Sequence, residues 1–325
     1  MPIGQRFASP SWQARLVHLL VAARMRPHAR RPIDPLWVRE HMGRPRSARR
    51  LMARSTGATV QLRAATGRWP GGEVLQWPGI DQTRAPVLLY LHGGGYIGCS
   101  PETHRSLVGS LVRRVRGSAF VPRYRLAPEH PFPAALDDAR GAYRYLLDEL
   151  QVDPARLVLV GDSAGGGLVL ALALAAREAG WPLPAALVTF SPWTDLAATG
   201  PSLDENSDRC AMFAGETIRR AARFYLGETD PYAPLVSPLY GDLRGLPPLL
   251  VHASTDEVLR DDAVRLAERA REAGVSVELQ LWRHVPHVWQ FFAAVLPEAR
   301  QSLAATRRFI LHQTSLTIAH RSPVT

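Results

Sequence analysis

The sequence predicts an α/β protein whose central sheet is mostly parallel and is covered by helices on both faces. Short apolar runs alternate with helical segments from Pro86 to Leu281, an order typical of parallel strands joined by crossover helices. One run, residues 157–160, has four branched apolar residues in succession, which indicates a strand buried on both faces. It leads through Gly161-Asp162-Ser163-Ala164-Gly165 into an apolar, alanine-rich helix over residues 168–177. We expect Ser163 at the tip of a tight strand-to-helix turn, because small neighbours let strand and helix approach closely.

The composition is that of a globular protein. The chain has 325 residues, of which 46% are hydrophobic and 21% charged, enough for one large domain with an appendage or for two ordinary domains. Cys99 and Cys210 give neither a disulfide framework nor a metal-ligand spacing, so we expect two isolated thiols, no metal site and a cytoplasmic location.

All 39 basic residues are arginine. The absence of lysine excludes Schiff-base and pyridoxal-phosphate chemistry, a lysine-containing phosphate loop and a Ser-Lys hydrolytic dyad. An activated serine in this chain must therefore use a histidine or a carboxylate as its base.

The net charge of +10 is concentrated at the N-terminus. Residues 1–54 contain 12 arginines and two acids (12 − 2 = +10), whereas the rest of the chain is neutral. Such a segment can contact nucleic acid or an anionic membrane, but a solvated, arginine-rich helical surface is the interpretation we favour, and no nucleic-acid partner is expected. The apolar run 16–23 is too short to span a bilayer and lacks a cleavage site, so we predict neither a transmembrane segment nor a signal peptide.

Two helices are predicted before the first strand. In residues 12–25 the apolar side chains recur at helical spacing and form one apolar face; they are Trp12, Leu16, Leu19, Leu20 and Ala23. Asp34-Pro35 is a typical helix start and predicts a short helix over residues 36–42. Since both helices precede the sheet, we expect them to form an appendage.

The strands and later helices follow from apolar runs and turn signals. Residues 59–65 and 73–77 flank a Trp-Pro-Gly-Gly turn and predict an antiparallel hairpin at a sheet edge. Further strands are expected over residues 86–91, 118–122, 157–160, 185–190, 249–253 and 275–281, with helices over 101–115, 133–150, 215–225 and 261–272. Residues 195–230 interrupt the alternation and are predicted to lie above the strand ends, where such sheets bind ligands. The tail after residue 315 carries little pattern, and we expect it to be disordered.

A nucleophilic serine needs a base, and the base needs an orienting acid. In a fold with this kind of serine turn, the chain order is Ser, then Asp or Glu, then His. Asp256, directly after the strand 249–253, is favoured as the acid over its neighbour Glu257 and over the helix-start acids Asp261 and Asp262. The base candidates after the last strand are His284 and His287.

The glycine-rich loop His92-Gly93-Gly94-Gly95-Tyr96-Ile97-Gly98 has two interpretations. It satisfies a dinucleotide-binding fingerprint after a strand, but that fingerprint requires an acid about 20 residues further on, and no acid lies between Glu102 and Glu129. The favoured interpretation is an oxyanion loop whose backbone N–H groups face the substrate, with His92 holding the loop in place.

Four segments together resemble the hormone-sensitive-lipase-like branch of the α/β-hydrolases, bacterial carboxylesterases with an HGGG motif. They are His92–Tyr96, the run Tyr124-Arg125-Leu126-Ala127-Pro128-Glu129-His130-Pro131-Phe132-Pro133-Ala134, Gly161–Gly166 and Asp256–Asp261. The resemblance implies an α/β-hydrolase fold, a triad of Ser163, Asp256 and His287, and oxyanion donors at Gly93, Gly94 and Ala164. It also implies a helical cap built from residues 1–54 and 195–230 on a catalytic domain of residues 55–194 and 231–315.

The chain departs from the pattern of this branch in two places. Val288-Trp289 follows His287, and Glu257 stands where proline is common. Both departures bear on the shape of the pocket, for which Tyr96, Trp193 and Trp289 are candidate lining residues, with ordinary packing as the alternative for each.

We therefore expect a carboxylic ester hydrolase that acts on small-molecule esters with short- to medium-chain acyl groups through an acyl-enzyme, without metal or organic cofactor. A lactone hydrolase or an N-acetyl amide hydrolase would use the same triad and stays open. A non-catalytic relative should lack a triad member, and none is missing. The oligomeric state is left open, with a homodimer as one option.

Overall fold

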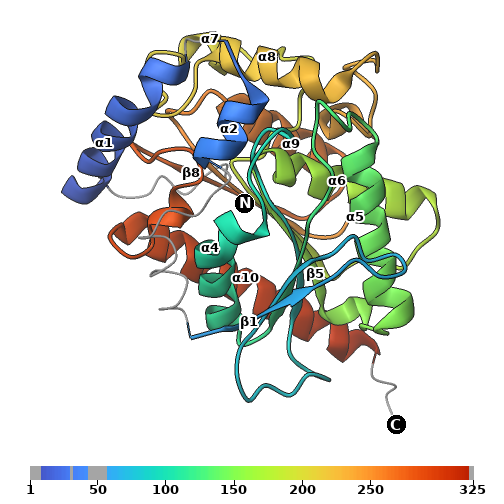
Figure 1. Cartoon of the computed structure of the whole chain (residues 1–325). Helices are drawn as coiled ribbons and strands as arrows, with labels where there is room; N and C mark the ends of the chain where they lie inside the picture. Colours follow the sequence, from blue (N-terminus) through green and yellow to red (C-terminus); the bar gives the residue numbers. More distant parts are fainter. Residues whose placement is uncertain (1–8, 30–31, 43–56, 322–325) are drawn as a thin grey trace.

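The computed structural model describes residues 9–29, 32–42 and 57–321 (Figure 1). Its centre is an eight-stranded sheet in the order β1-β2-β4-β3-β5-β6-β7-β8. Strands β1 and β2 form the predicted edge hairpin, β2 and β4 are also antiparallel, and all other neighbours are parallel. The strands are β1 (Thr59–Arg63), β2 (Gly72–Gln76), β3 (Val87–Leu91), β4 (Ser118–Pro122), β5 (Leu157–Asp162), β6 (Ala186–Phe190), β7 (Leu249–Ser254) and β8 (Val277–Trp282).

The strand order reverses between β3 and β5. From β3 the chain moves outward to β4 and then returns to place β5 on the other side of β3. In an open parallel sheet, the carboxyl ends of the two strands at such a reversal border the crevice in which ligands bind. The glycine-rich loop follows β3 and the serine turn follows β5, so both lie at this crevice.

Helices cover both faces of the sheet, as predicted (Figure 1). On one face, α4 (Pro101–Val115) packs beside α10 (Pro297–Arg321) over the apolar side chains of β3 and β5. The opposite face is covered by α5 (Ala134–Arg144), α6 (Ala164–Glu178) and α9 (Arg260–Glu272). The strands β3, β5 and β6 are buried along their whole length, which explains their continuous apolar sequences.

Two expectations differ from the structure. The helix predicted over residues 133–150 is α-helical only to Arg144 and continues as a π-helical turn, Tyr145–Glu149. The prediction of disorder after residue 315 is wrong as far as Arg321, because α10 continues to that residue. Short 3₁₀ turns, which carry no strong sequence signal, complete the chain at Pro154–Arg156, Pro238–Tyr240 and Trp289–Phe292.

Four helices lie together at the upper edge of the molecule in Figure 1: α1 (Trp12–Ala29), α2 (Pro35–Met42), α7 (Ser202–Glu205) and α8 (Gly215–Leu226). Hydrogen bonds join the N-terminal helix to the 195–230 insertion. Thr217 Oγ1 donates to Ala29 O (2.6 Å), Arg26 Nε donates to Cys210 O (3.2 Å), and His18 Nε2 lies 3.1 Å from Arg209 O. The two segments that were expected to cooperate above the strand ends are therefore in direct contact.

Arg39 of α2 joins this helix to two loops, the glycine-rich loop and the run that starts at Tyr124. Its guanidinium donates to Ile97 O (2.9 Å) and Ala127 O (2.7 Å) and pairs with the Glu129 carboxylate (2.5 Å). Ile97 belongs to the glycine-rich loop, and Glu129 lies in the run that starts at Tyr124. A single arginine thus links α2 to both loops.

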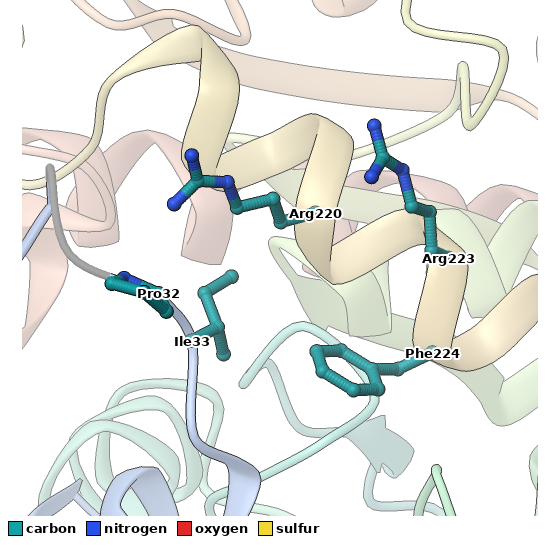
Figure 2. Close-up of a pocket in the computed structure, with 5 residues that line it drawn as sticks. All are labelled: Pro32, Ile33, Arg220, Arg223 and Phe224. Atoms are coloured by element: carbon teal, nitrogen blue, oxygen red, sulfur yellow. The ribbon is translucent and has the colours of Figure 1, made fainter.

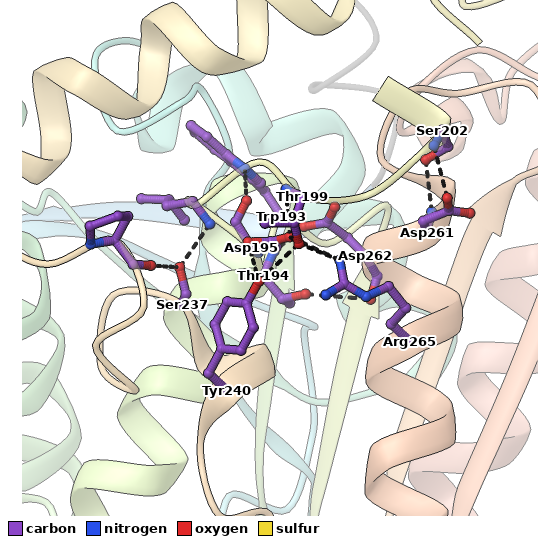
Figure 3. Close-up of polar contacts among 12 residues, drawn as sticks. Trp193, Thr194, Asp195, Thr199, Ser202, Ser237, Tyr240, Asp261, Asp262 and Arg265 are labelled. Carbon is purple, nitrogen blue, oxygen red and sulfur yellow. Dashed lines mark hydrogen bonds and ion pairs between the residues drawn. The ribbon is translucent and has the colours of Figure 1, made fainter. Parts of the chain in front are cut away.

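The base of the insertion is fixed to α9 by carboxylates, of which Asp262 and Asp195 are buried (Figure 3). Asp262 Oδ2 accepts the N–H groups of Thr194 (2.7 Å) and Asp195 (2.8 Å), and Asp261 accepts that of Ser202 (2.8 Å). Asp195 pairs with Arg265 at 2.9 Å. The two acids that the sequence placed at a helix start therefore hold both ends of the 194–202 loop.

This network should make the folding stability depend on pH. Burial, with the nearby charge of Asp195, raises the pKa of Asp262 to about 8. A folded-state pKa above the unfolded value of about 3.9 gives a stabilisation that is complete below the unfolded pKa and is lost as the pH rises to the folded pKa. We expect the free energy of unfolding of the wild type to fall from pH 5 to pH 8, and that of Asp262→Asn to fall less. Urea denaturation at pH 5, 6.5 and 8 measures both.

Asp137→Asn, in which the replaced carboxyl is exposed on α5, is the matched control and should follow the wild type. Parallel pH profiles for the wild type and Asp262→Asn would refute this prediction. The asparagine oxygen can still accept both N–H groups, so the comparison isolates the charge.

Candidate active site

The serine turn between β5 and α6 has the strained geometry that its glycines predict. Ser163 has φ of 54° and ψ of −125°, a backbone conformation that non-glycine residues rarely adopt. A Cβ on Gly165 would collide with the carbonyl oxygen of Leu91, so only glycine lets α6 start this close to β3. The turn is held by Ser163 N–H donating to Phe190 O (2.8 Å) and by Ser163 O accepting from Trp193 N–H (2.9 Å). Ser163 is thereby fixed at the positive end of α6.

The glycine-rich loop is held in place by a buried polar cluster around Asp162. Asp162 Oδ1 accepts hydrogen bonds from Gly93 N–H (3.1 Å) and Tyr90 Oη (2.7 Å), and Asp162 Oδ2 lies 3.3 Å from His104 Nε2. Burial alone would raise the pKa of Asp162, but its interactions with His104 and Tyr90 hold that pKa below its ordinary value. The carboxylate next to the serine therefore stays charged and fixes the loop. The sequence pattern contained Asp162 but gave no signal for His104.

His92 holds the other side of this loop, as its sequence interpretation predicted. Its Nδ1 lies 2.8 Å from Gly93 O. Tyr124 Oη donates to His92 O (2.6 Å), and the rings of His92 and Tyr124 stack with their centroids 4.2 Å apart. Burial lowers the pKa of His92 to about 3, so the imidazole is neutral near pH 7.

The N–H group of Gly93 was predicted as an oxyanion donor, and this prediction is wrong because Asp162 takes that hydrogen bond. The N–H groups of Gly94, Gly95 and Ala164 donate to no other group in the part of the chain that the structure describes. Gly94 has φ of 122°, and a Cβ there would collide with Gly98 O, so the loop requires glycine at this position. Of the three predicted donors, two therefore remain free.

The histidine loop after β8 is held in a strained conformation. His284 and Val288 both have positive φ, 53° and 50°. Ser254 Oγ donates to Val285 O (2.8 Å), and Val288 N–H donates to Ser191 Oγ (3.2 Å). Such backbone strain persists only where surrounding contacts determine it, and it is common at functional sites.

His287 pairs with Glu257 and not with Asp256. His287 Nδ1 lies 2.5 Å from Glu257 Oε2, and both side chains are buried. Asp256 instead accepts the backbone N–H of His284 (2.9 Å) and lies 3.1 Å from its Nδ1. The predicted pairing of Asp256 with His287 is therefore wrong in this structure: Asp256 holds the loop, and Glu257 orients the ring.

The second nitrogen of His287, Nε2, is buried and has no hydrogen-bond partner among the described residues. The serine turn and the histidine loop are anchored to neighbouring residues, because Phe190 O accepts from Ser163 N–H and Ser191 Oγ accepts from Val288 N–H. The ring of Phe213, from the insertion, stands edge-on to the imidazole at 5.2 Å. Nothing in the sequence pattern pointed to Phe213.

The three candidate pocket residues are all buried. The ring of Tyr96 stacks on that of Tyr225 in α8, with the ring centroids 3.7 Å apart, and so joins the glycine-rich loop to the insertion. The ring centroid of Trp193 lies 6.1 Å from that of Tyr96. Trp289 is fully buried in a cluster with Trp282 and packs 5.7 Å from that ring. Packing, the alternative kept open for each, accounts for Trp289.

Two hollows lie beside α1 and α8. A groove of about 510 Å³ runs between α1 and the segment 207–214 and reaches Phe213, with Leu19, Ala22, Ala23 and Arg26 on its α1 side. A smaller hollow of about 330 Å³ lies between α8 and the segment before α2. Figure 2 shows Ile33 and Phe224 beside this smaller hollow, with the guanidinium of Arg223 extending away from both. Only the larger groove leads to a residue in contact with His287.

The described residues contain no cluster of three or more His, Cys, Asp or Glu side chains that could bind a metal ion. Within the same residues, no helix combines the length and apolar character needed to cross a bilayer.

The fold and the placement of a strained serine after β5, a glycine-rich loop after β3 and a carboxylate-paired histidine after β8 are those of a serine hydrolase. Residues 88–291 match the model of a family described by its alpha/beta hydrolase fold. An acetyl-hydrolase of Streptomyces hygroscopicus is 46% identical over 235 residues, which are 72% of this chain and 78% of that relative.

Two solved structures are similar over almost the whole chain. The crystal structure of EstE5 soaked with p-nitrophenyl butyrate has a TM-score of 0.85 at 35% identity and covers 94% of this chain and 99% of its own. An esterase from the bacterial hormone-sensitive lipase family has a TM-score of 0.81 at 39% identity, with 94% and 100% covered. The chain belongs to the α/β-hydrolase fold family and, within it, to the bacterial hormone-sensitive-lipase esterases.

Proposed function

We propose that this chain hydrolyses carboxylic esters of small alcohols and short- to medium-chain acids by two-step acyl transfer. Ser163 is the nucleophile, His287 the general base, and Glu257 the acid that orients His287. The observation that carries the proposal is the buried 2.5 Å contact between His287 Nδ1 and Glu257 Oε2, with Nε2 left unpartnered in the described part of the chain. It supports a tautomer whose proton sits on Nδ1 and whose electron pair sits on Nε2.

In the first step, Nε2 takes the proton of the Ser163 hydroxyl while Oγ attacks the ester carbonyl carbon. The tetrahedral intermediate collapses when His287 returns the proton to the leaving alkoxide, which leaves an acyl group on Ser163. In the second step, His287 removes a proton from water, the hydroxide attacks the acyl carbon, and the acid departs as Ser163 recovers its proton. Glu257 stabilises the imidazolium that forms in each step.

The negative charge on each intermediate would be received by the N–H groups of Gly94, Gly95 and Ala164, with Gly95 in place of the predicted Gly93. These groups are free of other hydrogen bonds in the described residues, and Ala164 N–H also lies at the N-terminus of α6. One such donor contributes roughly 10²–10³ in rate.

A small acyl group is supported by the rings that surround the site. Phe213 packs against His287 in a T-shaped contact, and the stacked Tyr96 and Tyr225 join the glycine loop to α8. The acetyl-hydrolase of Streptomyces hygroscopicus and the EstE5 structure soaked with p-nitrophenyl butyrate point to acyl groups of this size.

The test compares p-nitrophenyl acetate, butyrate and octanoate with a γ-lactone and p-nitroacetanilide, for the wild type and two histidine variants. We expect the esters to be preferred. His287→Ala should lower kcat/KM by about 10⁴-fold or more, whereas His284→Ala, whose ring is half-exposed, should stay within about 10-fold. A preference for the lactone or the anilide would mean that the enzyme is not primarily an esterase. A large loss of kcat/KM in His284→Ala with a small loss in His287→Ala would make His284 the base.

A further inference from the structure

The predicted apolar face of α1 exists, but it points outward. Trp12, Leu16, Leu19 and Leu20 follow the helical spacing i, i+4, i+7 and i+8, and their exposed fractions are 70%, 45%, 65% and 61%. We name these four residues, together with the exposed Ala23, the outer stripe of α1. A continuous apolar stripe of this length left in water marks a surface that meets an apolar partner.

The outward orientation of the stripe is fixed by contacts on the other side of the helix. Ser11 N–H and Oγ donate to the Glu298 carboxylate (2.8 and 3.0 Å), and Ala14 is buried in the cluster of Trp282 and Trp289. At the far end of the helix, Arg26 binds the backbone carbonyl of Cys210. Because both ends of α1 are held in this way, the helix cannot rotate its stripe inward without breaking these bonds.

Positive charge borders the stripe. Arg15 and Arg24 are exposed, and neither forms an ion pair with any residue that the structure describes. The sequence of α1 contains no acidic residue, and residues 1–54 as a whole carry 12 arginines and two acids. Arginines beside an apolar helical stripe with a tryptophan at its end are the features of a helix that lies in the interface of an anionic lipid surface.

The stripe is continuous with the groove that leads to the site. Leu19 and Ala23 belong to both, and the groove ends at Phe213, whose ring contacts His287. A lipid layer against α1 would therefore lie at the open side of this groove. In Figure 1, α1 lies at the outer edge of the molecule, away from the sheet.

We propose that α1 docks the protein, through its outer stripe and bordering arginines, on the surface of an anionic phospholipid bilayer. Docking requires no hydrolysis, so it does not depend on the proposed function. The apolar side chains would enter the boundary between the lipid headgroups and the acyl chains, while the guanidinium groups would remain among the lipid phosphates. Nucleic acid, which arginines also attract, would leave the apolar stripe in water and is the weaker partner for this surface.

Flotation of the full chain with vesicles tests this proposal. Vesicles of equimolar phosphatidylcholine and phosphatidylglycerol should bind the wild type and Ser163→Ala equally at 50 mM NaCl, with binding lowered at 500 mM NaCl and with pure phosphatidylcholine. The double variant Leu16→Glu/Leu20→Glu should bind at least about 10-fold more weakly, because it places two charges in the apolar contact. Its turnover of water-soluble p-nitrophenyl acetate should be unchanged, since neither residue touches the site.

Val60→Glu/Leu62→Glu is the matched control, because both residues are exposed apolar side chains on the edge strand β1. This variant should bind vesicles like the wild type. The proposal is overturned if the wild type does not float with the anionic vesicles, or if both double variants lose binding equally. It is also overturned if the α1 variant only converts a dimer to a monomer in sedimentation, or if the wild type binds duplex DNA but not vesicles.

Discussion

Ser163→Ala should abolish ester hydrolysis, with a loss of kcat of about 10⁶-fold, the size seen when the nucleophile of a serine hydrolase is removed. The reason is chemical: without Oγ no acyl-enzyme forms, and the remaining oxyanion donors only assist direct attack by water. Initial rates with p-nitrophenyl butyrate, measured at high enzyme concentration, give the residual activity. Turnover close to that of the wild type would refute Ser163 as the nucleophile.

A glycine at the same position separates folding from chemistry. Ser163 has φ of 54°, which costs an L-residue about 1–3 kcal/mol and costs glycine little. Ser163→Gly should therefore be as inactive as Ser163→Ala but should unfold at a higher temperature than that variant. If the glycine variant unfolded at the lower temperature of the two, the inference that Ser163 has a strained backbone would be refuted.

Glu257→Gln should lower kcat by about 10³–10⁴-fold, whereas Asp256→Asn should stay within about 10-fold of the wild type. In the first variant, an amide NH₂ can face His287 Nδ1 and favour the tautomer whose proton is on Nε2, where it blocks the serine. In the second, the asparagine oxygen can still accept the His284 N–H group, so the loop keeps its shape. Steady-state kinetics on one ester compares the two variants directly.

The two neighbouring acids make each variant the control for the other, since both changes remove one charge at adjacent positions. Thermal unfolding of both proteins checks that the losses are not losses of fold. A collapse of activity in Asp256→Asn together with an active Glu257→Gln would restore Asp256 as the acid of the triad, as the family resemblance implied.

The fold could be predicted from local patterns because each pattern has a steric or solvation cause. The buried strands β3, β5 and β6 could be predicted from unbroken apolar runs, because both faces of each strand are covered by helices. The glycines at 161 and 165 mark the serine turn because a side chain there would strike the neighbouring backbone. The π-helical turn at Tyr145 and the end of α10 had no comparable local cause in the sequence.

The site was predicted less completely, because hydrogen-bond partners are chosen in three dimensions. His104, which supports Asp162, comes from α4 and is 58 residues away in the chain. Phe213, whose ring packs against His287, comes from the insertion. Neither residue carries a pattern of its own, because each acts through a contact that exists only after the chain folds.

By itself, the sequence determined the parallel sheet, the serine at its turn, the glycine loop and the two candidate histidines, because spacing and side-chain size decide these locally. The tertiary structure decided which groups meet. Glu257 reaches His287 because Asp256 is held by the His284 backbone, and Gly93 is lost as an oxyanion donor because Asp162 takes its N–H group. It also turned the apolar stripe of α1 outward, because Glu298 and the cluster around Trp282 hold the other side of that helix.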